Sequence, residues 1–364
     1  MIHIFIGTKA QFIKMAPIMQ ELDRRAVCFN FIDTGQHAGI TKDLPGQFGL
    51  RDPDVFLRKD RKNISRITEA VTWTAANLWT AGLRTDEIWK KIFREEKGIC
   101  LVHGDTLTTL FSLLYAKRCA LKVAHVEAGL RSYHILDPFP EEIIRRITMR
   151  YSDLLFAPSA WAHRNLQEMN FGEKSVDAGG NTILDTLRYA QQKKGTVSRP
   201  PGPYVVVTIH RFETIYSRTR MTFVVELLER MTRDRRVLFM LHEPTKNRLQ
   251  HFDLYNKIER LTSVEILPLQ PYISFIQLIS GADFIVTDGG SIQEESHFLS
   301  IPCLIMRTKT ERMEGLGANA LLAEFDWGNI DRFLETLPRL KHEKNPLDDV
   351  QPSLTIVDHL MPFA

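Results

Sequence analysis

Short apolar runs alternate with longer amphipathic stretches along the whole chain. In the first half, the apolar runs predict strands at residues 2–6, 28–33, 98–103, 122–127 and 154–157. The amphipathic stretches predict helices at residues 13–25, 64–95, 108–118, 141–150 and 160–169. A strand that is covered on both faces reads as a continuous apolar run, so this pattern predicts a mainly parallel sheet made of βαβ units.

The second half of the chain repeats the pattern. Strands are predicted at residues 204–208, 236–241, 264–267, 284–287 and 303–306, and helices at residues 221–230, 273–279 and 292–299. The expected fold class is therefore α/β, with two Rossmann-like domains whose parallel sheets face an interdomain cleft. A turn at residues 179–182 marks the boundary, so we assign residues 1–178 to the first domain and 179–351 to the second. Residues 352–360 predict a last helix.

Composition agrees with a globular protein of two domains. The chain has 364 residues, of which 44% are hydrophobic and 25% are charged, and these are ordinary values. A net charge of +3 does not favour binding to nucleic acid. No apolar run is long enough to span a membrane, and the N-terminus reads as a first strand, not as a signal peptide.

The four cysteines suggest a reducing compartment. None forms a CxxC pair, and three of them, Cys28, Cys100 and Cys303, lie in short apolar runs that predict buried positions. We therefore expect free thiols and a cytoplasmic location.

Three acidic residues follow predicted strands or begin a predicted helix: Asp105, Glu127 and Glu141. Carboxylates at the carboxyl ends of strands lie in the crevice where α/β sheets bind ligands, so the trio predicts an acid–base site. Each member also has a structural alternative. Asp105 could cap the following helix, and Glu127 could pair with Arg131. A poorly solvated Glu127 would instead have a raised pKa, which suits proton transfer near neutral pH.

The segment around Glu141 has a structural logic of its own. Pro140 fits the start of a helix, and acidic residues in a first turn are stabilised by the helix dipole. Glu142 can pair with Arg145 or Arg146 at helical spacing. Stabilisation of the helix start could therefore account for both glutamates.

A glycine turn follows the first predicted strand. Gly7-Thr8-Lys9 leads towards the next helix, which Lys14 is expected to open. Such a turn offers backbone N–H groups to an anion, and two nearby lysines would add positive charge. The alternative is a plain strand-to-helix turn with surface lysines.

In the second half, His210 and Arg211 follow the first predicted strand, and His242 follows the next one. These are crevice positions. A histidine beside an arginine suits phosphate recognition or proton transfer.

The segment Thr287-Asp-Gly-Gly-Ser-Ile-Gln-Glu-Glu295 passes from a strand through a small-residue turn into a helix. Its backbone N–H groups and the Ser291 hydroxyl are suited to a diphosphate. Glu295, one turn into the helix, is placed to accept hydrogen bonds from ribose hydroxyls. Arg312 lies beyond the next strand and could bind phosphate in a bidentate manner. The alternative is a tight turn with no ligand.

Two other site classes have little support. Asp105, His125 and Glu127 could form part of a zinc site, but no cysteine or second histidine joins them at metal-ligand spacing. A serine hydrolase is not indicated, because the chain has no Gly-x-Ser-x-Gly nucleophile turn. We therefore predict no metal and no cofactor.

Read in order, these segments resemble the UDP-N-acetylglucosamine 2-epimerase family over nearly the whole chain. The matching segments are residues 7–8, 14–17, 34–37, 104–106, 125–131, 138–142, 180–182, 210–211, 288–295 and 310–315. No one segment is decisive, but this many in one order is specific. The resemblance implies a glycosyltransferase-B-like fold with a UDP-sugar in the interdomain cleft. It also implies that a last helix, at about residues 352–364, packs back on the first domain.

The family's reaction is an anti-elimination of UDP that gives 2-acetamidoglucal, followed by re-addition of UDP. By resemblance, the catalytic candidates are Asp105, Glu127, Glu141 and His210. The expected substrate and UDP contacts are Lys9, Lys14, Arg145, Arg211, His242, Phe275, Gly290, Ser291, Glu295 and Arg312. Of these, Phe275 is expected near uracil. The resemblance further implies a homodimer.

The chain also departs from the family pattern. Lys9 stands where the family usually has arginine, the hydroxyl of Ser291 lies two positions later than usual, and Phe212 replaces a second arginine after His210. Our leading hypothesis is a non-hydrolysing epimerase that makes UDP-N-acetylmannosamine for surface polysaccharide. The alternatives are a hydrolysing member that releases UDP and N-acetylmannosamine, an epimerase of a related UDP-N-acetylhexosamine, and a weakened UDP-sugar-binding protein.

Overall fold

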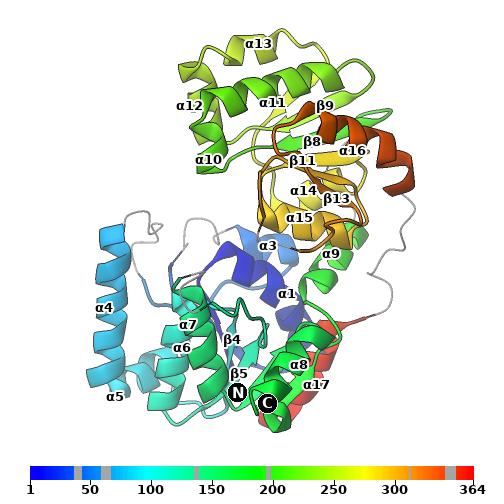
Figure 1. The fold of residues 1–364 in the computed structure, drawn as a ribbon. Coiled ribbons are helices and arrows are strands. Elements are labelled where there is room, and N and C mark those ends of the chain that lie inside the picture. The colour runs from blue at the N-terminus through cyan, green and yellow to red at the C-terminus, as the bar shows by residue number, and fades with distance from the viewer. Residues whose placement is uncertain are drawn as a thin grey trace. The chain divides into compact units, whose positions relative to one another are not determined.

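All strands in the described part of the chain belong to two parallel sheets, which confirms the expected α/β class with two Rossmann-like parts (Figure 1). The computed structural model describes residues 1–36, 43–58, 67–134, 139–193, 197, 199–310, 313–340 and 350–364. The chain divides into two compact units, Met1–Thr186 with Val350–Ala364, and Leu187–Asp349.

The sheet of the first unit has the strand order β3-β2-β1-β4-β5-β6-β7. These strands are β1 (Ile2–Ile6), β2 (Phe29–Asp33), β3 (Val55–Phe56), β4 (Ile99–His103), β5 (Lys122–Val126), β6 (Leu154–Ala157) and β7 (Ser175–Asp177). The strand order reverses between β1 and β4. That reversal opens a crevice at their carboxyl ends, where sheets of this type bind ligands.

Helices lie on both sides of this sheet (Figure 1). They are α1 (Lys9–Arg24), α3 (Leu44–Phe48), α4 (Ile67–Leu83), α5 (Thr85–Glu87), the π-helix η1 (Ile88–Ile92), α6 (Leu107–Arg118), α7 (Glu141–Tyr151), α8 (Ala160–Glu168), the 3-10 turn η2 (Gly172–Lys174), α17 (Pro352–Leu360) and the 3-10 turn η4 (Met361–Phe363). The single helix expected at residues 64–95 is therefore wrong. α4 ends just after Gly82, and the acidic residues Asp86 and Glu87 belong to the first turn of a separate helix.

The second unit repeats the arrangement, with the strand order β10-β9-β8-β11-β12-β13. Its strands are β8 (Tyr204–Thr208), β9 (Arg236–Met240), β10 (Val264–Leu267), β11 (Phe284–Thr287), β12 (Cys303–Ile305) and β13 (Ala320–Leu322). Its helices are α10 (Phe212–Ile215), α11 (Arg218–Met231), α12 (Glu243–His251), α13 (Tyr255–Glu259), α14 (Tyr272–Ile279), α15 (Gly290–Phe298) and α16 (Trp327–Leu340). Here the strand order reverses between β8 and β11.

The boundary between the units falls inside α9 (Ile183–Gln192), a few residues beyond the position expected from the turn at residues 179–182. Two hydrogen bonds attach the start of α9 to the first unit. The Thr186 hydroxyl donates to the carbonyl of Ile13 at 2.6 Å, and the Asp185 carboxylate accepts from the amide of Ser353 at 2.8 Å. Ser353 lies in α17, which packs against α1 in the same unit.

The structure tests the expected burial of the cysteines and the expected lack of a membrane span. Cys100 and Cys303 are buried and Cys28 is exposed, so the expected burial of Cys28 is wrong. Cys28 lies in the turn before β2 begins at Phe29, outside the part of the apolar run that the sheet covers. Within the described ranges, every helix is too short or too polar to cross a membrane.

Gly129 allows the loop after β5 to lie against α8. Its φ is +88°, and an added Cβ would come within 2.2 Å of the carbonyl oxygen of Ala162. We expect Gly129→Ala to destabilise the fold by about 3 kcal/mol, from left-handed strain together with overpacking. Gly179→Ala is the matched control, because Gly179 has a φ of +77° and its nearest contact would be an ordinary 3.8 Å. This control should cost only about 1 kcal/mol. Equal losses for both variants in urea unfolding would contradict the close approach.

Candidate functional site

Glu127, which directly follows β5, is held by two side chains in the crevice of the first unit. Lys14 donates to its Oε1 at 2.5 Å, and Asn181 donates to the same oxygen at 2.7 Å. Lys14 is buried and lies one turn inside α1, so the expectation that it opens a helix is wrong. The alternative of a Glu127–Arg131 pair is also wrong, because Arg131 pairs with Glu142.

The ionisation of Glu127 differs from the sequence-based expectation. Burial alone would raise its pKa, but the nearby Lys14 ammonium, the neighbouring His103 and the hydrogen bonds from Lys14 and Asn181 outweigh burial. The pKa of Glu127 therefore lies well below its usual range, and not above it as expected. Glu127 also has a φ of +67°. A left-handed glutamate is strained, and such strain is often found at functional sites.

Two buried histidines lie near Glu127. His103, at the end of β4, has its Nε2 atom 3.7 Å from the second carboxylate oxygen of Glu127. His125, in β5, donates from Nε2 to the carbonyl of Gly104 at 2.8 Å. Burial lowers the pKa of His103 to about 4 and that of His125 to about 3. Both rings are therefore neutral at pH 7, and Lys14 is the cation that keeps Glu127 ionised.

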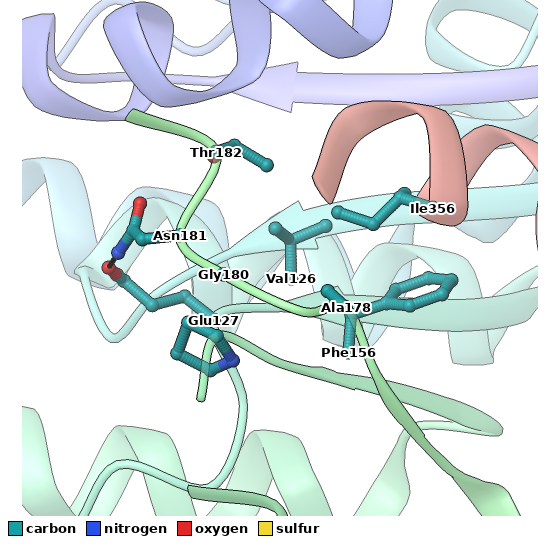
Figure 2. Close-up of a pocket in the computed structure, with 9 residues that line it drawn as sticks. Val126, Glu127, Phe156, Ala178, Gly180, Asn181, Thr182 and Ile356 are labelled. Atoms are coloured by element: carbon teal, nitrogen blue, oxygen red, sulfur yellow. Dashed lines mark hydrogen bonds between the residues drawn. The ribbon is translucent and has the colours of Figure 1, made fainter. Parts of the chain in front are cut away.

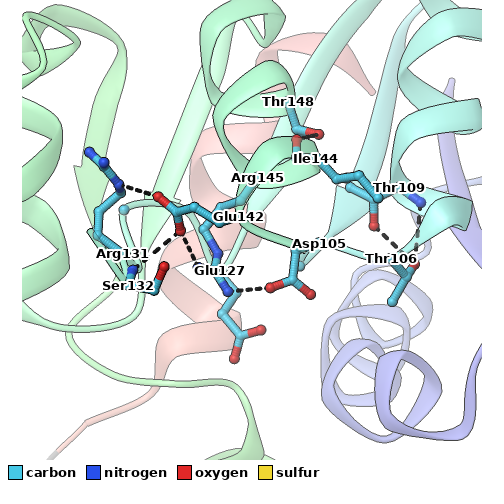
Figure 3. A network of polar contacts seen from close by, with 12 residues as sticks. Asp105, Thr106, Thr109, Glu127, Arg131, Ser132, Glu142, Ile144, Arg145 and Thr148 are labelled. Atoms are coloured by element: carbon cyan, nitrogen blue, oxygen red, sulfur yellow. Dashed lines mark hydrogen bonds and ion pairs between the residues drawn. The ribbon is translucent and has the colours of Figure 1, made fainter. Parts of the chain in front are cut away.

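Asp105 pairs with Arg145, a residue of α7 (Figure 3). The neighbouring Thr106 caps α6, so the alternative of Asp105 as the cap is wrong. Burial raises the pKa of Asp105 and Arg145 opposes that effect, while Glu127 and Glu141 raise it further. Glu127 and Glu141 are thus both near enough to Asp105 to affect its pKa.

Glu142 binds three donors in this part of the crevice. Its fully buried carboxylate accepts from Arg131 Nε at 2.6 Å, from Arg145 Nη1 at 2.7 Å and from the amide of Ser132 at 3.2 Å (Figure 3). Of the two arginines proposed as its helical partner, Arg145 is therefore the correct one. By contrast, one oxygen of Glu141 is buried and has no hydrogen-bond partner among the described residues.

The glycine turn after β1 does not offer its first amides to an anion. The N–H groups of Gly7 and Thr8 both donate to the side-chain oxygen of Gln11, at 3.0 and 3.3 Å. Thr8 and Gln11 form a reciprocal capping box at the start of α1. Lys9 is the first residue of that helix and is exposed.

A small cavity of about 10 Å³ lies next to Glu127, between Asn181 and α17 (Figure 2). Val126, Thr182 and Ile356 also line it. This volume is close to that of one water molecule, so the cavity is too small to hold a nucleotide.

The second unit places His210 at its own strand-order reversal. The fully buried Asp288 follows β11 and accepts from the amides of His210, at 3.0 and 3.2 Å, and of Arg211, at 2.9 Å. The Asp288 carboxylate also lies 3.5 Å from Nδ1 of His210. The His210 ring stacks on His242, with ring centroids 4.7 Å apart. Thr208 in turn contacts Nε2 of His242 at 3.3 Å.

The start of α15 is suited to an anion. Its N-cap is Gly289, which has no side chain to cap the helix, and an added Cβ there would lie 3.0 Å from the His210 ring. Gly290 is buried and Ser291 is exposed in the first turn. The N–H groups of a first turn that lacks a side-chain cap bind negative groups well.

Glu295 already has a partner inside the second unit. The buried hydroxyl of Tyr272 donates to its Oε1 at 2.9 Å. Burial and the carboxylate raise the pKa of Tyr272 well above its ordinary value, so the hydroxyl stays protonated and donates. Phe275 is half-buried in the same helix as Tyr272. The predicted phosphate ligand Arg312 lies outside the described residues.

Four side chains that organise the two crevices escaped the sequence-based assignment of site residues: Asn181, Glu142, Asp288 and Tyr272. Asn181 and Asp288 stand in segments that had been recognised from the sequence. Asp288 directly follows β11, and Asn181 lies in the turn between β7 and α9, so both positions were an available signal. Tyr272 had none, because its contact with Glu295 depends on tertiary packing. The zinc alternative gains no support. His125 bonds to the backbone, and the described residues contain no group of three ligands suited to a metal.

The chain is similar to known proteins over nearly its full length. A family model described as UDP-N-acetylglucosamine 2-epimerase matches residues 20–361. The UDP-N-acetylglucosamine 2-epimerase of Methanocaldococcus jannaschii is 30% identical over 371 residues, which cover 98% of this chain and 97% of the relative. The UDP-2,3-diacetamido-2,3-dideoxy-D-glucuronate 2-epimerase of Pseudomonas aeruginosa is 30% identical over 327 residues, covering 87% and 86%. The solved structure of the M. jannaschii UDP-GlcNAc 2-epimerase in complex with UDP-GlcNAc and UDP has a TM-score of 0.74 at 29% identity and covers 99% of both chains.

Proposed function

Because the chain belongs to the UDP-N-acetylglucosamine 2-epimerase family, we propose that it interconverts UDP-N-acetylglucosamine and UDP-N-acetylmannosamine without net hydrolysis. The observation that carries this proposal is the group of Asp105, Glu127 and Glu141 in one crevice, where Lys14 and Arg145 contact two of the three. The solved relative with UDP-GlcNAc and UDP bound supports the choice of substrate.

The UDP moiety is proposed to bind the second unit. There the first turn of α15, with Gly290 and Ser291, would hold the diphosphate, and Arg211 and Arg312 would add positive charge. Glu295 would accept from the ribose, and Phe275 would lie near uracil. The acetamido sugar is proposed to bind at the carboxylates of the first unit, with Lys9, Lys14, His210 and His242 as further contacts.

The proposed reaction removes a proton from C2 of the sugar while the C1–O bond breaks. The electron pair of the C2–H bond forms the C1=C2 double bond of 2-acetamidoglucal, and the electrons of the C1–O bond leave with UDP. Protonation of C2 from the opposite face and return of UDP to C1 complete the inversion. The reaction needs proton carriers on two faces and cations that stabilise departing UDP.

The environments of the carboxylates suggest different roles. Glu127 stays ionised beside Lys14, so we propose that its negative charge stabilises the positive charge that develops on the sugar as UDP departs. Asp105 has a raised pKa, and Glu141 has a buried oxygen without a partner. These two are the proposed proton carriers. The raised pKa of Asp105 suits proton transfer near neutral pH, and the buried oxygen of Glu141 is proposed to take up or release the second proton.

The setting of the reaction is also proposed. We infer a cytoplasmic enzyme that acts as a homodimer and supplies a precursor for surface polysaccharide. The four free cysteines of the chain agree with a reducing compartment. Light scattering of the purified protein would test the dimer, and a monomer at micromolar concentration would contradict it.

One experiment separates the candidate functions. The protein is incubated with UDP-N-acetylglucosamine in deuterated water and followed by proton NMR. We expect UDP-N-acetylmannosamine to appear with deuterium at C2. Free N-acetylmannosamine with UDP would indicate a hydrolysing enzyme. Exchange only with a related UDP-sugar would indicate another substrate, as the P. aeruginosa relative illustrates. Binding of the UDP-sugar without deuterium exchange would indicate a UDP-sugar-binding protein that is not an epimerase.

A further inference from the structure

We propose that Glu142 is a positioning residue that holds the Arg145 guanidinium against the Asp105 carboxylate. Glu142 does not touch Asp105 in the hydrogen-bond network of the crevice. It acts through Arg145, which donates from Nη1 to Glu142 and from Nη2 to Asp105 (Figure 3). The catalytic part of this inference rests on the proposed function, and the electrostatic part rests on geometry alone.

The geometry of Glu142 is that of an anchor. Its side chain is fully buried, and both carboxylate oxygens accept hydrogen bonds, one from Arg131 and the other from Arg145 and the Ser132 amide. Burial raises the pKa of Glu142, but these donors outweigh burial and lower it. The Glu142 carboxylate is therefore ionised at neutral pH, and it shares the guanidinium of Arg145 with the carboxyl group of Asp105.

The pairing fixes a long and flexible side chain. Arg145 exposes only 12% of its side chain and has one carboxylate partner from its own helix and one from the turn after β4. An arginine fork that is already held at one end loses less conformational freedom when it binds at the other end. Without Glu142, Arg145 would be free to leave Asp105, whose other acidic neighbours, Glu127 and Glu141, both raise its pKa.

Removal of Glu142 can change the pKa of Asp105 in two opposite directions. Loss of the negative charge alone would strengthen the pull of Arg145 on Asp105 and lower the pKa of Asp105. Release of Arg145 would raise that pKa, because burial and the two acidic neighbours, which all raise it, would no longer be opposed. The direction of the change therefore distinguishes positioning from simple charge removal.

The test is a carbon NMR titration of the protein labelled with [13C]aspartate, in which Asp105→Asn identifies the Asp105 signal. We expect the Asp105 midpoint to move to higher pH in Glu142→Gln. A second variant, Arg131→Met with Glu142→Met, replaces a buried ion pair with apolar side chains, a change that proteins often tolerate. This double variant removes one positive and one negative charge, and the Asp105 midpoint should again move to higher pH. A midpoint that stays in place or moves to lower pH in the variants that fold would overturn the inference.

Arg131→Met alone is the matched control, because it leaves the Glu142–Arg145 contact in place. Its Asp105 midpoint should remain close to that of the wild type, and a shift as large as in the Glu142 variants would refute positioning through Arg145. With UDP-N-acetylglucosamine, we expect kcat of Glu142→Gln to fall about 10- to 100-fold, with the pH profile of kcat/KM displaced in the direction of the titration. A wild-type protein without turnover would refute the proposed function and leave the titration to decide the role of Glu142.

Discussion

We expect Glu127→Gln to lose about 10²- to 10³-fold in kcat while it binds UDP almost as well as the wild type. Glutamine has nearly the same shape as glutamate. Its amide oxygen can still accept from Lys14 and Asn181, so the crevice should keep its geometry. What disappears is the negative charge that Lys14 maintains at the proposed sugar site. Since elimination of UDP precedes proton exchange with solvent, deuterium incorporation at C2 should fall with the rate of epimerisation.

Glu87→Gln is a suitable control for this variant. Glu87 is an exposed residue of α5 that pairs with Lys91, and loss of such a surface pair changes little. UDP affinity of each variant can be measured by calorimetry. Unchanged deuterium exchange in Glu127→Gln would remove Glu127 from the mechanism, and loss of UDP binding would show that the substitution disturbs more than the reacting centre.

The apolar pattern predicts the long strands of both sheets because a strand that is buried on both faces leaves a continuous signal. It misses β3, β7 and β13, which have only two or three residues each and lie at the edges of the sheets. An edge strand is covered by fewer neighbours, and a run of two residues has no recognisable period.

In the candidate site, the sequence predicts where the residues lie better than how they ionise. The positions of Asp105 and Glu127 are predictable because each follows the end of a buried strand. Their ionisation is not predictable, because it depends on distant partners. Lys14 precedes Glu127 by 113 residues, and Asn181 follows it by 54. Burial alone would give Glu127 the raised pKa that local reasoning predicts, and tertiary contacts with Lys14, His103 and Asn181 reverse the result.

Acid should unfold the first unit at a pH well above the usual range for carboxyl titration. Three of its histidines are buried in the neutral form: His3, His103 and His125. Burial lowers the pKa of His3 and of His103 from 6.5 to about 4, and that of His125 to about 3. Because the folded pKa values lie below the unfolded ones, the stability from the neutral rings is fully present above pH 6.5. It is lost as the pH falls towards 4. Three extra protons on the unfolded chain correspond to a slope of about 4 kcal/mol per pH unit near pH 5.

Urea unfolding at pH 7, 6 and 5, followed by tryptophan fluorescence, measures this slope. Four of the five tryptophans, Trp73, Trp79, Trp89 and Trp161, lie in the first unit, so the signal reports mainly on it. Glu127 also loses stabilising free energy as the pH falls, but only at lower pH. Because its folded pKa is lowered, this loss begins below about pH 4.5. In His3→Gln the slope between pH 6 and 5 should fall by about one third, since one of three protons is removed. A stability that stays constant from pH 7 to 5 would mean that these rings are not buried in the neutral form.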